Sequence, residues 1–270
     1  MDSGTVVLIT GASSGIGLMC ARHLQQRGYR VYGTSRRPAA QSQPFMLIEM
    51  DVDDEASVQR GIEHITADAG RLDVVVNNAG YPLIGAVEDT SISEARAQFE
   101  TNFFGALRVC RAALPIMRAQ RAGRIVNISS MASTIGVPFY GVYSASKAAL
   151  ESATDALRIE VAPFGVKVIL IQPGDFHTSV ANYRRRAEQS RDHSAYREAC
   201  ETVALAMERD EIKGGSPEPV AQLLEHILAS RSPRPRYRVG PWLEQLAVIA
   251  KPNLPGKLFD WIVRQFYHLN

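Results

Sequence analysis

The sequence has 270 residues, of which 46% are hydrophobic and 21% are charged, and its formal net charge is only +2. This composition suits a globular α/β protein, and so small a net charge argues against nucleic acid or an anionic membrane as the main partner. The three cysteines, Cys20, Cys110 and Cys200, lie far apart and form no Cys-x-x-Cys pair. We therefore expect free thiols and a cytoplasmic location rather than a disulfide framework.

Membrane and metal-binding classes find little support. No run reaches the roughly 18 continuous apolar residues that a membrane-spanning helix needs, and we expect no signal peptide before residue 6. Cys20 and His23 share a helix face, which fits either buried packing or a metal ligand pair. Because a structural metal site takes about four ligands and no others lie nearby, the sequence predicts no metal.

Short apolar strands alternate with amphipathic helices along most of the chain. The predicted strands cover residues 6–10, 30–35, 45–52, 72–78, 123–130 and 166–174. The predicted helices cover residues 15–28, 54–70, about 91–117 with a break near Asn102, and about 143–163. Buried strands separated by helices form a parallel sheet that is covered on both faces. We therefore predict a single doubly wound, Rossmann-type α/β domain over residues 1–270.

Two segments lie outside this alternation: residues 175–216, which become polar and helical, and a C-terminal tail at about 241–270. We interpret the first as an insertion over the sheet that acts as a substrate lid. Its helix carries an apolar stripe with steps of three and four residues. The stripe consists of Tyr196, Ala199, Cys200, Val203 and Met207. It is expected either to form an apolar substrate pocket with Phe139 and Leu83, or to pack on the body of the protein.

The first strand is followed by Thr-Gly-Ala-Ser-Ser-Gly-Ile-Gly, residues 10–17, at the start of a helix. Glycines at positions 11, 15 and 17 allow a tight turn and close approach of a ligand to the backbone. The helix that follows presents unpaired N–H groups and a positive dipole end to a phosphate. A Gly-rich turn can also be purely structural, but its position between strand and helix favours phosphate binding.

The second strand ends in Ser35, Arg36 and Arg37. NAD-binding folds place an acidic residue here, about 20 positions after the glycines, to bind the ribose 2′-hydroxyl. A guanidinium instead suits a 2′-phosphate, so the local chemistry favours NADP(H). The alternative is a solvated basic turn.

Further motifs follow in order: Asn-Asn-Ala-Gly at residues 77–80, Asn102, Ser130, Tyr-Ser-Ala-Ser-Lys at residues 143–147, and Pro-Gly at residues 173–174. Together with the Gly-rich turn, this series resembles the short-chain dehydrogenase/reductase family over about residues 5–180. The separation of Ser130 from Tyr143 matches the family's serine-to-tyrosine spacing and selects Ser130 over Ser129. Ser133 departs from the family pattern, in which many members carry glycine.

The resemblance implies a catalytic set of Asn102, Ser130, Tyr143 and Lys147. Tyr143 and Lys147 are four residues apart on a helix, so they project from one face. A free phenol has a pKa near 10, and a nearby ammonium lowers it toward the working pH. Ser130 is expected to hydrogen-bond the substrate oxygen, while Asn102 supports a water relay behind Lys147.

The same resemblance implies the cofactor contacts. Ser14 and Arg36 are expected at the 2′-phosphate with Arg37 nearby, and Asp51 and Val52 at the adenine, although Asp51 also fits a strand-end cap. Lys147 is expected to bind the nicotinamide ribose. The complete expected set is Gly11, Ser13, Ser14, Gly15, Ile16, Gly17, Arg36, Arg37, Asp51, Val52, Asn78, Ala79, Gly80, Tyr143, Lys147, Pro173, Gly174 and Thr178.

We accordingly predict an NADP(H)-dependent oxidoreductase, a carbonyl reductase acting on a small-molecule carbonyl or secondary alcohol, with lipophilic steroid- or retinoid-like compounds favoured. A non-catalytic NADP(H)-binding sensor is the alternative; a nucleotide-sugar epimerase is disfavoured because its larger substrate domain hardly fits this length. Small and apolar residues on more than one face of the helix at 143–163 predict a homodimer or homotetramer, with a self-contained monomer as the alternative. Two basic runs, residues 183–186 and 231–238, are interpreted as solvated surfaces, with anion sites as the alternative.

Overall fold

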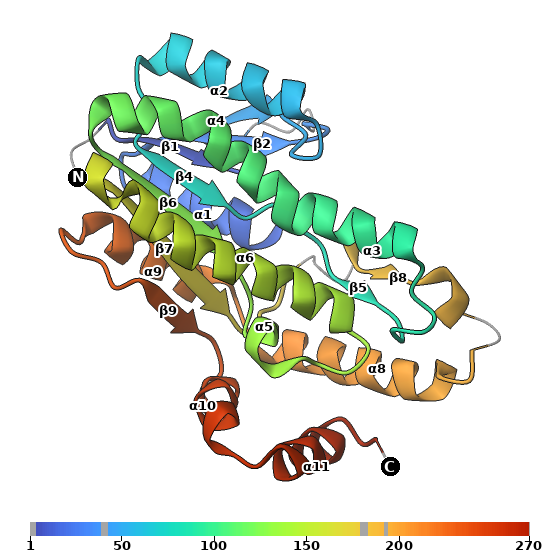
Figure 1. Ribbon diagram of the computed structural model, residues 1–270. Helices are drawn as coiled ribbons and strands as arrows, with labels where there is room; N and C mark the ends of the chain where they lie inside the picture. The colour runs from blue at the N-terminus through green and yellow to red at the C-terminus, as the bar shows by residue number, and fades with distance from the viewer. Residues whose placement is uncertain (1–3, 39–42, 179–182, 192–193, 270) are drawn as a thin grey trace.

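Seven short strands form a parallel sheet with helices on both faces (Figure 1). The computed structural model describes residues 4–38, 43–178, 183–191 and 194–269. The strands are β1 (Val6–Ile9), β2 (Arg30–Ser35), β3 (Met46–Glu49), β4 (Val74–Asn77), β6 (Gly123–Ile128), β7 (Val166–Pro173) and β9 (Arg236–Val239). Their order in the sheet is β3-β2-β1-β4-β6-β7-β9, and every ladder is parallel. The predicted Rossmann-type architecture is confirmed.

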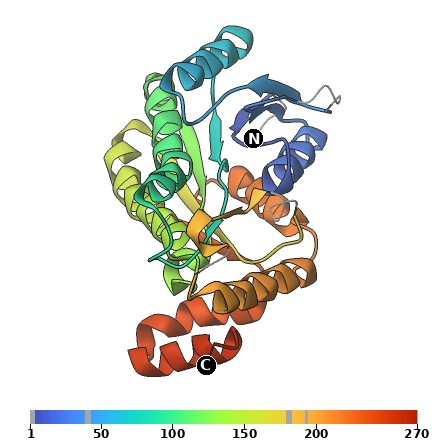
Figure 2. The same cartoon turned by 90° about the vertical axis from the view of Figure 1, so that its right-hand side faces the viewer.

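Two layers of helices cover the sheet because its strands are apolar on both faces. On one side lie α2 (Glu55–Ala69), α4 (Gly105–Gln120) and α6 (Gly141–Val161); on the other lie α1 (Gly15–Gln26) and α9 (Glu218–Ala229) (Figure 2). Alternate residues of a strand enter opposite cores, as in β1, where Val7 and Ile9 pack with α1 and α9 while Val6 and Leu8 face α2 and α4. Burial of each strand on both sides explains its continuous apolar sequence.

The long predicted helix is interrupted where the sequence pattern placed its break. Helix α3 (Ile92–Phe99) begins with a capping box, in which the Ser91 hydroxyl accepts from the Glu94 N–H and the Glu94 carboxylate accepts from the Ser91 N–H. A π-helical turn, Glu100–Phe104, then joins α3 to α4 and contains Asn102. Such turns interrupt the regular hydrogen bonding and are frequent at functional sites.

A smaller group of elements gathers beyond the carboxyl ends of the strands. It contains α5 (Ala132–Ile135), α8 (Arg197–Lys213) and a two-stranded parallel sheet of β5 (Leu83–Ile84) and β8 (Arg185–Arg186). The tail helices α10 (Trp242–Ala250) and α11 (Gly256–Phe266) lie next to α8 in both views (Figures 1 and 2). Strands β8 and β9 were missed by the sequence interpretation, since both lie in runs that looked like solvated basic surface.

The apolar stripe of α8 has a different role from the one preferred from sequence. Cys200 and Val203 are fully buried in an interior cluster with Ile84, Val137 and Tyr267. Met207 is the member of the stripe that lines the cavity described below, and the expected partners Phe139 and Leu83 do not line it. Packing on the body of the protein, the weaker alternative, therefore describes most of the stripe. No helix in the described ranges is both long and apolar enough to cross a bilayer.

Candidate active site

A cavity of about 1110 Å³ opens at the carboxyl ends of the strands. It extends from the turn after β1 to the end of β7 and passes between β1 and β4, where the order of successive strands in the sheet reverses. Open α/β sheets bind their ligands at this topological switch point. The volume exceeds what a small substrate alone needs, so there is space for a dinucleotide and a second molecule.

The Gly-rich turn forms one end of the cavity and requires glycine for steric reasons. Gly11 and Gly15 have φ angles of +66° and +55°. A Cβ on Gly11 would lie 2.9 Å from the Cα of Ala79, so the neighbouring loop could not approach. The Thr10 hydroxyl accepts from the Asn78 and Ala79 N–H groups, each at 3.0 Å. These contacts join the loop after β1 to the loop after β4, and the N-terminus of α1 faces the cavity.

Gly17 has a packing role instead of the expected cofactor contact. It does not line the cavity, and a Cβ there would lie 2.4 Å from the Gly11 carbonyl oxygen and 2.5 Å from Nδ2 of Asn78. Asn102 also lies behind the cavity wall. The expected residues that do line it are Gly11, Ser13, Ser14, Gly15, Ile16, Arg36, Arg37, Asp51, Val52, Asn78, Ala79, Gly80, Ser130, Tyr143, Lys147, Pro173, Gly174 and Thr178.

The end of β2 presents cationic side chains and no carboxylate to the cavity. Arg36 and Arg37 are exposed and line it, and Arg36 forms no ion pair with any described residue. Ser14, the N-cap of α1, uses its side chain for no capping hydrogen bond. A hydroxyl, a guanidinium and a helix N-terminus therefore surround the same part of the cavity, where all three suit a phosphate.

At the other end, Ser130 and Tyr143 face one another. The Ser130 hydroxyl hydrogen-bonds the Tyr143 phenol, whereas the Ser129 hydroxyl turns away and donates to Glu151 at 2.7 Å. Ser130 also accepts from the Ala132 N–H at 3.1 Å, which fixes its side chain at the start of α5. Both serines line the cavity, but the Ser129 hydroxyl is engaged with Glu151 while the Ser130 hydroxyl faces Tyr143.

Lys147 lies one turn along α6 from Tyr143, with Asn102 behind it. Its ammonium donates to the Ile128 carbonyl at 2.9 Å. The Asn102 side chain is 1% exposed, accepts from the Tyr81 N–H at 3.1 Å and donates to Ser146 at 3.2 Å. A Cβ on Gly80 would lie 2.9 Å from Oδ1 of Asn102 and 3.6 Å from Nζ of Lys147. Glycine at position 80 therefore allows these side chains to meet.

Burial controls the protonation of this pair, and here the structure differs from the sequence expectation. Desolvation raises the pKa of Tyr143 to about 12, and the hydrogen bond from Ser130 is the interaction that lowers it, not the Lys147 ammonium. Burial also lowers the pKa of Lys147 to about 8, opposed by the negative charge of Glu151. Tyr143 therefore carries its proton at neutral pH and is ready to act as an acid.

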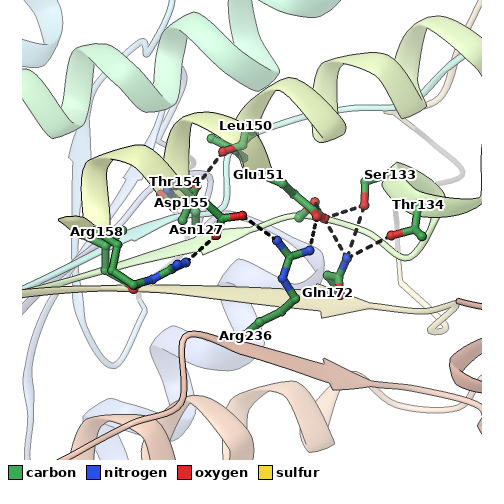
Figure 3. Close-up of polar contacts among 12 residues, drawn as sticks. Asn127, Ser133, Thr134, Leu150, Glu151, Thr154, Asp155, Arg158, Gln172 and Arg236 are labelled. Carbon is green, nitrogen blue, oxygen red and sulfur yellow. Dashed lines mark hydrogen bonds and ion pairs between the residues drawn. The ribbon is translucent and has the colours of Figure 1, made fainter. Parts of the chain in front are cut away.

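The loop that carries Ser130 is fixed by a polar network around Glu151 (Figure 3). This carboxylate accepts from the Ser129 and Ser133 hydroxyls and, at 2.9 Å, from the Gln172 amide. It also pairs with Arg236, which bonds Asp155 at 3.1 Å. Glu151 was missed from sequence, although its position four residues after Lys147 places it on the same helix face. Ser133, the departure from the family pattern, is part of this network.

Further polar side chains reach the cavity from segments that the sequence interpretation left out of the site. Arg184 forms an ion pair with Glu211 of α8, and the Arg185 guanidinium lies 4.2 Å from the centre of the Tyr81 ring. All four residues line the cavity, as do Asp175, Glu244, Tyr140 and Tyr267. The basic run at 183–186 is therefore only partly a solvated surface, since Tyr183 and Arg185 are exposed while Arg184 is nearly buried in its ion pair. Charge-rich sequence alone carries no signal that these side chains point inward.

Comparison with known proteins places this geometry in a family. The family model described as short chain dehydrogenase matches residues 5–189. A 3-ketodihydrosphingosine reductase from Bacteroides thetaiotaomicron is 39% identical over 262 residues, covering 97% of each chain. The crystal structure of a short-chain dehydrogenase from Streptomyces avermitilis superposes with a TM-score of 0.79 at 33% identity, covering 95% of this chain and 97% of that one. A metagenomic short-chain oxidoreductase in complex with NADP gives 0.68 at 25% identity, covering 88% and 97%.

The chain belongs to the short-chain dehydrogenase/reductase family and is an oxidoreductase. The cavity fits a nicotinamide dinucleotide, because the Gly-rich turn permits backbone approach and the N-terminus of α1 faces a phosphate position. When bound, the nicotinamide supplies or accepts the hydride. The side chains at this end of the cavity that can donate hydrogen bonds to an oxygen are the protonated phenol of Tyr143 and the hydroxyl of Ser130.

We expect Tyr143→Phe to abolish turnover while NADPH still binds, because the substitution removes the hydroxyl and leaves the ring. Steady-state assays should show loss of at least a hundredfold in kcat, of the size typical for a missing general acid. Fluorescence titration should give an NADPH Kd within about threefold of the wild type. The exposed Tyr196→Phe is the matched control and should keep full activity. More than a tenth of wild-type activity in Tyr143→Phe would contradict the assignment.

Proposed function

We propose that this protein is an NADP(H)-dependent reductase of lipophilic ketones. The observation that carries the proposal is the meeting of Ser130, Tyr143 and Lys147 in a cavity whose far end holds Arg36. Ser130 and Tyr143 stabilise and protonate the developing alkoxide, while Lys147 holds the ribose and Asn102 supports proton supply behind it. A cytoplasmic location agrees with the three free, buried cysteines.

NADP(H) is favoured by the charges at the end of β2. Arg36 is exposed and forms no ion pair with any described residue, although it lowers the pKa of Asp53, so its guanidinium is available to a 2′-phosphate. Ser14 and Arg37 line the same region. The family member solved with NADP shows that this fold accommodates that cofactor.

A lipophilic substrate is favoured by the apolar walls near Tyr143 and by the relatives. Ile135, Val137 and Met207 line the cavity at this end. The Bacteroides relative is named for reduction of 3-ketodihydrosphingosine, a ketone of a long-chain lipid. We propose a substrate of that kind, a ketone attached to a long alkyl chain, over the steroid or retinoid class.

The alternative is a sensor that binds NADP(H) without turnover. A sensor can dispense with the acid, the lysine or the serine, but all three are present and oriented. Absence of NADPH oxidation with every ketone tested would favour the sensor.

Assembly into a homodimer or homotetramer is proposed from the outer face of α6. This face is exposed and consists of small and apolar side chains, which allow close helix-to-helix approach. Its residues are Ala145, Ala148, Ser152, Ala156 and Ile159, the last 78% exposed.

Cofactor preference tests the role of Arg36. We expect the native protein to prefer NADPH over NADH by at least tenfold in kcat/KM, about 1.4 kcal/mol, and Arg36→Asp to remove or reverse that preference. Arg60→Asp, an equal charge change on the exposed side of α2, should leave the preference intact. Equal use of both cofactors by the native protein would refute the NADP(H) proposal.

Chain length tests the substrate class. With NADPH, kcat/KM should rise along the series 2-butanone, 2-octanone and 2-dodecanone because each added methylene buries apolar surface. Met207→Asp should raise KM for 2-dodecanone more than for 2-butanone. The control Leu205→Asp places the same charge on a side chain of α8 that is 52% exposed and should leave the series unchanged. A series that is flat or falls with length would exclude the lipophilic class.

Sedimentation velocity tests the assembly. At micromolar concentration the native chain should sediment as a dimer or tetramer, and Ala148→Glu should shift it toward monomer by placing a charge in the contact. Ala67→Glu on the exposed side of α2 is the control and should not change the distribution. A native chain that sediments purely as monomer would exclude the proposal.

A further inference from the structure

One end of the cavity holds more carboxyl groups than the nearby cations pair with. Asp175 follows directly after Gly174, at the carboxyl end of β7, and its side chain has no hydrogen bond or ion pair with any described residue. Glu244, from tail helix α10, reaches the same place, where its Oε2 accepts from the Asp175 N–H at 3.0 Å. Both residues line the cavity. Two carboxyl groups from distant segments thus meet beside the candidate catalytic tyrosine.

The cations nearby are already engaged. Arg184 pairs with Glu211, and both side chains are nearly buried, so this pair contributes no net charge. Lys147 donates to the Ile128 carbonyl, and Arg185 lies over the Tyr81 ring. Arg184 lowers the pKa of Asp175 but is shared with Glu211, and neither Asp175 nor Glu244 forms an ion pair with any described residue.

A second observation also indicates a missing ligand at this end. Tyr140 lines the cavity and is 2% exposed, yet its hydroxyl has no hydrogen-bond partner among the described residues. Buried hydroxyls nearly always have one. The Tyr140 phenol is close enough to Asp175 for the carboxylate to raise its pKa, so both belong to the same region.

Contact between Glu244 and the β7 end is close and specific. A Cβ on Gly174 would lie 2.0 Å from Oε2 of Glu244, so glycine at this position allows the carboxyl group to enter. Its entry without a cation has a cost. Burial and the neighbouring carboxyl groups raise the pKa of Asp175 well above its usual range, and burial raises that of Glu244 to about 7.

We infer that Asp175 and Glu244 form a binding site for a protonated amine of the substrate, which places the substrate in the class of amino ketones with the amine close to the carbonyl. This inference rests on the proposed ketone reduction. An ammonium bound between the two carboxyl groups supplies the missing positive charge while Tyr143 faces the ketone oxygen. A neutral ketone lacks this interaction, so the site determines specificity rather than the reaction itself.

The charged and titratable groups around the pair define its pH dependence. Besides Asp175 and Glu244 themselves, these groups are Asp210 and Glu211 from α8, Arg184 before β8, Tyr140 and Tyr143 at the start of α6, and Tyr267 after α11. Near pH 6 the pair holds protons in the free protein, because the carboxyl pKa values are raised. Binding of an ammonium favours the ionised carboxylates and must therefore release protons.

Calorimetry on the full chain loaded with NADPH tests the site with n-octylamine and n-octanol, which have the same alkyl chain. We expect octylamine to bind at least tenfold more tightly, and titrations at pH 6 in two buffers of different ionisation enthalpy to show proton release. Equal affinity for the two ligands, or no proton release, would overturn the inference. Displacement of octylamine by millimolar Mg²⁺ would also overturn it, since the pair would then be a metal site.

Matched variants separate the site from general effects on folding. Asp175→Asn and Glu244→Gln should each reduce the octylamine-to-octanol affinity ratio at least fivefold, and this ratio is internal to each variant. Glu208→Gln, on the exposed side of α8, should leave the ratio unchanged. A ratio that stays at the wild-type value in both cavity variants, with NADPH binding retained, would refute the assignment.

Turnover separates this inference from the proposed function. The ratio of kcat/KM for 3-ketodihydrosphingosine to that for a ketone of equal length without the amine should exceed ten and fall at least tenfold in Asp175→Asn. Reduction of both ketones with equal kcat/KM would remove the amine site and leave the reductase intact. Selective octylamine binding without reduction of either ketone would remove the reductase and leave the cation site.

Discussion

The hydrogen bonds and the ion pair of the buried Glu151 carboxylate are the interactions on which the candidate active site depends. The carboxylate joins α6, the loop after β6, Gln172 of β7 and Arg236 of β9 in one hydrogen-bonded group (Figure 3). A buried charge is stable only when it is fully paired, so any loss of register between these elements leaves it uncompensated at a cost of several kcal/mol. The positions of Ser130 and Lys147 follow from this group, because each is attached to one of the elements that it joins.

Burial and proximity have opposite effects on the pKa of Tyr143 in the candidate catalytic pair, and burial dominates. Proximity of a cation to a phenol predicts an acidic tyrosine, but Tyr143 and Lys147 share a desolvated wall that favours the neutral form of both. The pKa values of the two groups therefore move apart, to about 12 for Tyr143 and about 8 for Lys147. Glu151 limits the fall for Lys147, so the same carboxylate that positions the lysine also keeps it charged.

The parts predictable from sequence are those that depend on local pattern. Buried strands such as β1, the Gly-rich turn and the interruption at Asn102 each have a signal within about ten residues, and all appear where expected. The spacing of Ser130 and Tyr143 also places both beyond the carboxyl ends of the strands, because these ends lie on the same side of a parallel sheet.

The remaining parts depend on contacts between distant segments and have no local signal. Glu244 reaches Asp175 across 69 positions, and Arg236 reaches Glu151 across 85. Charged side chains in such segments look like solvated surface, because sequence does not show whether a partner exists to neutralise them inside. For the same reason, the sequence indicates that the α8 stripe is buried but does not show whether it faces the cavity or packs in the protein interior.

The tail helices have a practical consequence for anyone handling the protein. Glu244 and Tyr267 form part of the cavity wall, so the tail helices lie beside the cavity. The first strand, in contrast, begins at the amino ends of the strands, on the far side from the cavity (Figure 1). An affinity tag, fluorescent fusion or surface tether attached after residue 270 is therefore poorly placed for measurements of ligand binding. An attachment ahead of β1 begins at the amino ends of the strands, away from the cavity at their carboxyl ends.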